Sequence, residues 1–181
     1  MIVGIAGTIG AGKDTIANFF VKNYNFKKIV MSNFLREIEK HRRVKPTRAN
    51  LRKLQLELRK KYGEEILMEM LLSKIVEKNL KRVVISGIRT LAEIKFLKKK
   101  LNAKIIFVDA KPEVRFLRIK KRGRIGDPKT YEQFLHEDAI ENAMFSLKKV
   151  KKFADFVIDN SFDVKNMERQ IRRIAKKMKL K

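Results

Sequence analysis

Residues 7–15, Gly7-Thr8-Ile9-Gly10-Ala11-Gly12-Lys13-Asp14-Thr15, decide the fold. They follow an apolar run, 2–6, that lacks alternation and is typical of a buried parallel strand, and they precede apolar residues at helical spacing. Glycines let a backbone turn tightly and approach an anion, and the amides of such a turn at a helix N-terminus attract phosphate. Lys13 adds a charge that reaches the outer phosphates. We therefore expect a phosphate site made by Gly7, Gly10, Ala11, Gly12 and Lys13, and not merely a structural turn.

After this loop, further apolar runs alternate with segments of helical periodicity. Candidate strands lie at 26–31, 83–86, 105–108 and 156–158. This alternation predicts βαβ units, and hence an α/β fold with a five-stranded parallel sheet covered by helices on both faces. We expect one domain over 1–181. Because ligands bind at the carboxyl ends of parallel strands, residues that directly follow each strand are the functional candidates.

Composition narrows the classes of function. The chain has 181 residues, 45 Lys plus Arg against 20 Asp plus Glu, and a formal charge of +25. The absence of cysteine excludes disulfides and thiolate zinc sites, and two histidines, His41 and His136, do not suffice for a histidine cage. No apolar run reaches the roughly 18 residues of a membrane span, so we expect a cytoplasmic protein without a membrane partner. The charge indicates either an anionic partner or the charged surface of a thermophile.

Two positions depart from the strict phosphate-loop pattern. A Ser or Thr normally follows the lysine, where its hydroxyl meets magnesium, but here Asp14 follows and Thr15 comes next. Ser86 ends the third strand, where many such enzymes place an Asp. Our hypothesis is that Asp14 supplies the missing carboxylate, so that Asp14 and Thr15 bind Mg²⁺ directly or through water. Alternatively, Asp14 only caps the helix. Asp109 is a second candidate carboxylate, on a strand expected to lie farther from the phosphates.

The ending Gly-Lys-Asp-Thr resembles that of phage-type deoxynucleoside monophosphate kinases, and its Lys-x-Thr spacing resembles adenylate kinase. The resemblance to P-loop nucleotide kinases continues, in motif order, to about residue 170. It implies a P-loop NTPase fold with three α/β/α layers and an Arg-rich lid. It also implies ATP and Mg²⁺ as cofactors, with Asp14 and Thr15 among the ATP-binding residues.

Arginines follow two of the predicted strands. Arg36 closes the segment 32–36 after the second strand, and Arg89 closes Ser86-Gly87-Ile88-Arg89 after the third. Two such arginines can grip an acceptor phosphate and orient it. The second segment is similar to the Asp-Gly-x-Pro-Arg segment of nucleoside monophosphate kinases, with Ser in place of Asp and no proline. The resemblance implies acceptor binding by Ser32, Arg36 and Arg89, within a helical insertion at about 36–80. A solvated charge at a helix start is the alternative for each arginine, and Arg48 and Arg59 are weaker candidates.

The segment Arg118-x-x-x-Arg122-x-Arg124-x-Gly-Asp127 looks like the lid of small-molecule kinases, at about 118–130. Such a lid brings arginines onto the transferring phosphoryl group and excludes water. The resemblance implies catalytic roles for Arg118, Arg122 and Arg124. A basic helix with a solvated face is the alternative. The next helix is expected to carry Phe134, Leu135, Ala139 and Ala143, while its acids Glu137, Asp138 and Glu141 balance the charge of the lid without chemistry of their own.

The segment 154–160 resembles the last strand and turn of dephospho-CoA kinases, which implies that Asn160 and Ser161 contact the base of ATP; a turn-forming Asn is the alternative.

The sequence therefore favours an ATP-dependent phosphotransferase acting on a small nucleotide, most simply a nucleoside or deoxynucleoside monophosphate. No strong general base is visible, which disfavours a hydroxyl acceptor. A dephospho-CoA kinase-like enzyme, a basic nucleic-acid-binding P-loop regulator and an NTPase switch remain alternatives. The sequence leaves the acceptor and the oligomeric state open.

Overall fold

The computed structural model describes residues 1–180, and within that range the chain forms five strands and nine helices. In chain order these are β1 (Ile2–Gly7), α1 (Lys13–Tyr24), β2 (Lys27–Val30), α2 (Met31–His41), α3 (Arg48–Tyr62), α4 (Ile66–Glu77), β3 (Val83–Ile88), α5 (Leu91–Leu101), β4 (Lys104–Asp109), α6 (Pro112–Arg122), α7 (Tyr131–Phe145), α8 (Leu147–Lys152), β5 (Phe156–Asp159) and α9 (Val164–Lys177). In this part of the chain no helix combines the length and the apolar character needed to cross a membrane.

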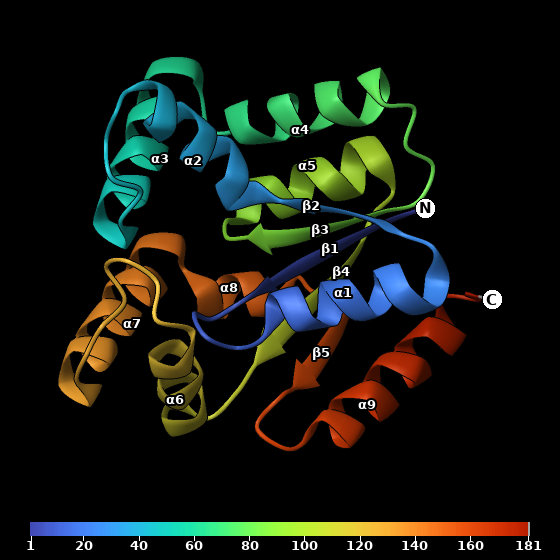
Figure 1. The fold of residues 1–181 in the computed structure, drawn as a ribbon. Coiled ribbons are helices and arrows are strands. Elements are labelled where there is room, and N and C mark those ends of the chain that lie inside the picture. Colours follow the sequence, from blue (N-terminus) through green and yellow to red (C-terminus); the bar gives the residue numbers. More distant parts are fainter. Residues whose placement is uncertain (181) are drawn as a thin grey trace.

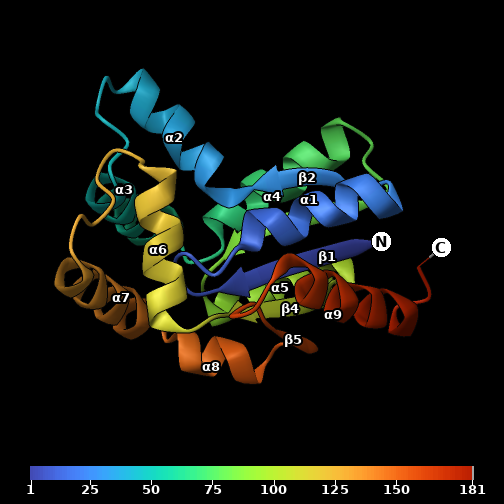
Figure 2. The same ribbon diagram turned by 60° about the horizontal axis from the view of Figure 1, so that its bottom comes forward.

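The strands form one parallel sheet in the order β2-β3-β1-β4-β5. Helices α1 and α9 cover one face, and α4, α5 and α8 cover the other (Figures 1 and 2). Side chains of β1 alternate between the two cores: Val3 and Ile5 pack toward α1 and α9, whereas Ile2 and Ala6 pack toward the opposite helices. The three-layer α/β/α arrangement expected from the sequence is confirmed, and its continuous apolar strands are those of a sheet buried on both faces.

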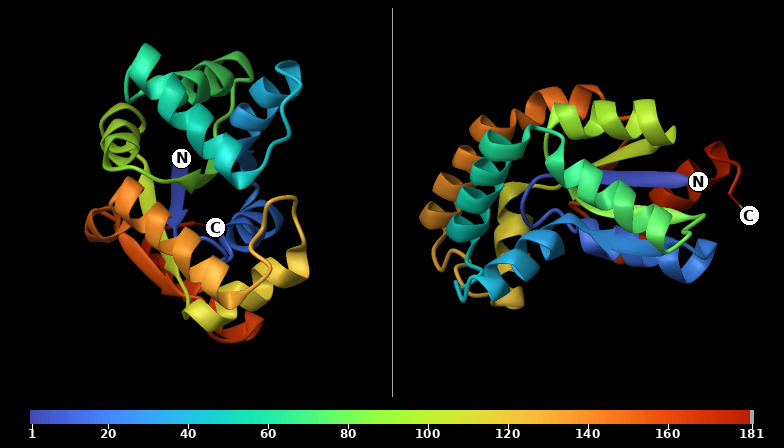
Figure 3. Two further views of the ribbon diagram at one scale, coloured as in Figure 1. Left: turned by 90° about the vertical axis from the view of Figure 1, so that its left-hand side faces the viewer. Right: turned by 90° about the horizontal axis from the view of Figure 1, so that it is seen from above.

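Two groups of helices stand beyond the carboxyl ends of the strands. Helices α2 and α3, which follow β2, lie on one side, while α6 and α7 lie on the other (Figure 3). The first group starts earlier than the insertion expected at about 36–80, because β2 ends at Val30 and α2 begins directly at Met31. Thr47 caps α3 by accepting from the Asn50 amide, and Gly63 ends this helix. The space between the two groups is where the candidate site lies.

Candidate functional site

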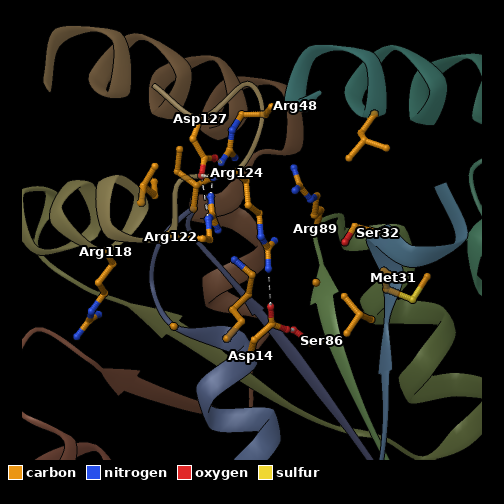
Figure 4. A pocket seen from close by; sticks show the side chains of 18 of the residues that line it. Asp14, Met31, Ser32, Arg48, Ser86, Arg89, Arg118, Arg122, Arg124 and Asp127 are labelled. Atoms are coloured by element: carbon orange, nitrogen blue, oxygen red, sulfur yellow. Dashed lines mark hydrogen bonds and ion pairs between the residues drawn. The ribbon is translucent and has the colours of Figure 1, made fainter. Parts of the chain in front are cut away.

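A cavity of about 450 Å³ opens at the carboxyl edge of the sheet. Its lining combines the loop before α1, the start of α2, one face of α3, the end of β3, the segment around the predicted lid and the loop before α9. Figure 4 shows charged side chains from these elements converging on this space. Segments far apart in the sequence are thus brought together at the edge where a parallel α/β sheet binds ligands.

The backbone of the loop requires glycine at two positions. Gly10 has φ +72° and Gly12 has φ +92°, which are left-handed conformations that other residues rarely adopt. A Cβ on Gly10 would lie 2.7 Å from the carbonyl oxygen of Arg115, and one on Gly12 would collide with the amide of Asn160. Gly12 is also the N-cap of α1, so the loop delivers its amides to the positive end of that helix. The expected phosphate-loop geometry is therefore present.

Lys13 lies folded under this loop. Its Nζ donates hydrogen bonds to the carbonyl oxygens of Gly7, at 2.9 Å, and Thr8, at 2.7 Å. Burial of the ammonium group, and then the positive charge of Arg89, lower the pKa of Lys13 to about 7. The charges of Glu141 and Asp14 act in the opposite direction. The protonation of the loop lysine is consequently sensitive to pH in the neutral range.

Asp14 does not cap α1. The N-cap is Gly12, and no capping hydrogen bond from a side chain forms at this helix start within the described residues. Instead, Oδ1 of Asp14 accepts a hydrogen bond of 2.9 Å from Oγ of Ser86, and Oδ2 lies 3.9 Å from Nη2 of Arg124. Asp14, Thr15 and Ser86 all line the cavity.

The donor set fits Mg²⁺ bound partly by a nucleotide. Carboxylate and hydroxyl oxygens are ligands that this ion prefers, and it usually retains waters and substrate phosphates in its shell. Residues 1–180 hold no group of three or more acidic or histidine side chains that could bind a metal ion without such help. The carboxylate of Asp14 is therefore the main protein group available to a magnesium ion beside the loop.

Asp109 contacts the phosphate loop from the neighbouring strand. Strand β4 pairs directly with β1, and Oδ1 of Asp109 accepts a hydrogen bond of 3.2 Å from Oγ1 of Thr8. Its other oxygen lies 3.1 Å from Nζ of Lys151. Asp109 braces the outside of the loop and does not line the cavity.

The residues predicted to bind an acceptor, Ser32, Arg36 and Arg89, all line the cavity. Burial, and then the charges of neighbouring arginines, lower the pKa of Arg36. Among the described residues this guanidinium has no acidic partner, and its one hydrogen bond, 3.5 Å long, goes to the carbonyl of Pro46. Arg89 lies 3.1 Å from Glu141 and over the ring of Phe145. Arg36 thus retains donors for an external anion.

The two weaker arginine candidates, Arg48 and Arg59, lie in different environments. Arg48, at the start of α3, lines the cavity and pairs with Asp127 at 2.9 Å and with Glu141 at 3.2 Å. Arg59 is buried and bonded to Glu93 at 2.6 Å, away from the cavity lining. Only Arg48 therefore belongs to the site.

The three lid arginines do not act as one cluster. Arg122 makes two hydrogen bonds to Asp127, and Arg124 extends toward Asp14 (Figure 4). Arg118 points to the other side of the cavity, close to where a side chain on Gly12 would begin. Its buried Nη1 has no hydrogen-bond partner within residues 1–180. All three arginines line the cavity, with Arg118 nearest the phosphate loop, and their catalytic roles stay a prediction.

In the loop after β5, Asn160 lines the cavity, and its contact with the base of ATP stays a prediction. Asn160 is buried, and its Nδ2 donates to the carbonyl of Ala11 at 2.8 Å, so that this amide braces the phosphate loop. Ser161 bonds to Asp159 and Lys111 and does not line the cavity. Phe162, 57% exposed, and Val164 line the mouth instead. Exposed apolar residues after a strand were the signal that sequence reasoning missed.

Of the apolar residues expected on helix α7, Phe134 is buried, whereas Leu135, Ala139 and Ala143 are exposed. Asp138, Glu141 and Phe145 complete the buried face of this helix. Asp138 pairs with the buried Arg115 at 2.5 Å. Burial by itself raises the pKa of Glu141, but Arg89 and Arg48 outweigh burial and hold this pKa below the ordinary range. The acids of α7 thus lie in the interior and orient arginines.

Comparisons with known proteins agree with this geometry. The family model described as an AAA domain matches residues 6–135. A UPF0200 protein of Hyperthermus butylicus is 32% identical over 98% of this chain and 95% of its own length, and one of Thermococcus sibiricus is 32% identical over 100% and 97%.

Among solved structures, shikimate kinase from Bacteroides thetaiotaomicron superposes with a TM-score of 0.63 at 19% identity, covering 99% of both chains. Deoxyadenosine kinase from M. mycoides, with bound dATP, gives 0.59 at 19% identity, covering 99% of this chain and 100% of its own. These neighbours establish the P-loop kinase fold. The sequence matches establish the family: the chain is a member of the UPF0200 proteins and carries an AAA domain.

Proposed function

We propose that this protein is an ATP-dependent kinase that transfers the γ-phosphoryl group of ATP to a nucleotide-type acceptor, most simply a nucleoside or deoxynucleoside monophosphate. One observation carries the proposal: a single cavity contains the phosphate loop with Lys13 on one side and Arg36 with Arg89 on the other. A nucleotide triphosphatase needs the first feature alone. Two arginines across the cavity can bind a second anion through their guanidinium donors.

In the proposed reaction, the loop amides and Lys13 hold the β and γ phosphates of ATP. Ser32, Arg36 and Arg89 hold the phosphate of the acceptor so that one of its oxygens faces the γ phosphorus. That oxygen forms a bond to the γ phosphorus as the bond to the β-γ bridging oxygen breaks, which yields ADP and a diphosphate. When bound, Mg²⁺ neutralises charge on the phosphates, and Asp14 and Thr15 are the residues that would hold it.

Arg122 and Arg124 would stabilise charge that spreads over the transferring phosphoryl group. Arg118 would bind the donor, because it lies beside Gly12. The acceptor phosphate is already anionic at neutral pH and needs no general base. Glu141 is a poor base, since two arginines hold its pKa low and occupy its oxygens. This favours a monophosphate over a hydroxyl acceptor such as that of dephospho-CoA.

The experiment is a coupled assay of ADP formation with ATP and each nucleoside monophosphate, the deoxy forms and dephospho-CoA, with Lys13→Ala as the control. We expect one class of monophosphate to stimulate ADP formation well above the control. ADP formation without any acceptor would identify an NTPase switch. If no compound stimulates turnover above the Lys13→Ala background, the kinase proposal is wrong.

The nucleic-acid-binding alternative is tested separately. Exposed basic residues lie on helices of both faces of the sheet, for example Lys99 on α5, Lys149 on α8 and Arg173 on α9, so the excess charge does not mark one groove. Binding to duplex and to single strands should be weak and should vanish with added salt. Tight binding that persists at physiological salt would favour the regulator.

A further inference from the structure

Glu141 occupies an unusual place for an acidic side chain. It projects from the buried face of α7, its side chain is 4% exposed, and it lines the cavity that the anionic ligands would enter. A buried carboxylate is costly unless charged partners compensate it. Its two oxygens meet two arginines from different elements: Oε1 lies 3.2 Å from Arg48 on α3, and Oε2 lies 3.1 Å from Arg89 after β3.

Because each carboxylate oxygen of Glu141 contacts a different arginine, Arg89 keeps donors that a ligand can use. A guanidinium has five N–H donors, and Glu141 takes one nitrogen of Arg89. Within residues 1–180 the side chain of Arg89 makes no other hydrogen bond, and its guanidinium rests on the ring of Phe145, one turn farther along α7. Glu141 and Phe145 thus fix the orientation of Arg89 without using up its donors.

In contrast to Arg89, Arg48 has both of its terminal nitrogens bonded to protein carboxylates. One of its terminal nitrogens bonds to Glu141 and the other to Asp127, while its Nε is buried and without a partner among the described residues. Through these bonds Arg48 links α7, the lid segment and the start of α3. Arg48 thereby fixes the relative positions of these elements around the cavity.

From this geometry we propose that Glu141 is a positioning residue: it aligns Arg89 toward the acceptor and, through Arg48, fixes the acceptor side relative to the donor loop. The proposal rests on the kinase function above for the role of Arg89. Removal of this carboxylate charge would leave Arg48, Arg89 and Lys13 facing one another with less compensation. Arg89 would then lose the contact that fixes its orientation and turn away from the acceptor.

The variant Glu141→Gln tests this role against the matched control Glu132→Gln. Glu132 lies in the first turn of the same helix, is exposed and does not line the cavity. For Glu141→Gln we expect the acceptor KM to rise at least ~10-fold while kcat changes less than about threefold, the pattern of lost positioning. Glu132→Gln should leave both constants close to wild type.

A second measurement does not need turnover. The Kd of nucleoside monophosphates, measured by calorimetry without ATP, should rise at least ~10-fold in Glu141→Gln, because Arg89 is no longer held toward the bound phosphate, whereas the Kd for ATP should change less than about twofold. Glu141→Asp keeps the charge with a shorter reach, so it should restore part of the lost affinity. This variant also serves if Glu141→Gln fails to fold.

The outcomes separate the two proposals. If no acceptor stimulates the wild-type protein, the kinase function fails, but calorimetry with nucleoside monophosphates still tests whether Glu141 holds Arg89 toward an anion. Equal Kd values for the monophosphates in wild type and Glu141→Gln would overturn the proposed role. A fall in kcat at unchanged KM would also overturn it, since that result would make Glu141 a general base.

Discussion

Ser86 donates a hydrogen bond of 2.9 Å from its Oγ to Oδ1 of Asp14, which joins the end of β3 to the first turn of α1. In phosphate-loop NTPases the hydroxyl usually follows the loop lysine and the carboxylate ends the strand. Here the same two groups meet with their chain positions exchanged. A carboxylate and a hydroxyl thus lie beside the loop, although neither position matches the usual pattern.

This exchange predicts the metal dependence. Asp14→Asn should raise the Mg²⁺ concentration needed for half-maximal ATP turnover by ~10-fold or more, because a neutral amide is a weaker ligand for a hard cation. The double variant Asp14→Ser/Ser86→Asp restores the usual arrangement and should recover much of the loss seen in Asp14→Ser alone. Binding of Mn²⁺ in the presence of ADP, followed by electron paramagnetic resonance, gives a readout without turnover. Unchanged metal dependence in Asp14→Asn would exclude the role.

The pKa of Lys13, near 7 in the free protein, predicts how nucleotide binding varies with pH. Bound phosphates favour the charged lysine, so binding takes up a proton when Lys13 is neutral. ATP affinity should therefore be highest below pH 7 and fall above it, by up to ~10-fold per pH unit. Lys13→Met should bind more weakly and should lack this dependence. Equal slopes for both proteins between pH 7 and 9 would show that another group titrates.

The opposite orientations of Arg118 and Arg36 predict separable defects. Arg118→Ala should raise the Kd for ATP about 10-fold with little change in acceptor KM, because a charge-assisted contact on the donor side is lost. Arg36→Ala should show the reverse pattern. Calorimetry of ATP binding and acceptor titrations measure the two constants independently. If both variants raised both constants equally, the division of the cavity into two sides would be wrong.

Arg115 is a structural arginine despite its place beside the lid. It is 4% exposed and pairs through two nitrogens with Asp138. Arg115→Met leaves Asp138 buried without its partner and should lower the free energy of unfolding by about 3–5 kcal/mol. Chemical denaturation monitored by circular dichroism measures this loss. The exposed Arg172→Ala is the control, and similar stability of the two variants would contradict the interpretation.

Local patterns determined most of the fold. Unbroken apolar runs such as 105–108 and 156–158 lie within strands, and Thr47 and Gly63 bound α3 as their chemistry predicts. Helix α8, which has two apolar residues in six, was not anticipated. Apolar periodicity could not identify the buried acids of α7, because it counts apolar residues, whereas this helix borders a polar cavity and buries Asp138 and Glu141.

The sequence by itself determined the phosphate loop. Its glycines, its lysine and its place between a strand and a helix are contiguous, and backbone stereochemistry acts over a few residues. Only the tertiary structure decided which of the many arginines matter: Arg59 and Arg115 are buried in ion pairs, while Arg36 and Arg89 face the cavity. The reason is physical. The environment of a charge depends on elements that pack against it from distant parts of the chain, and only the order of strands and helices brings those elements together.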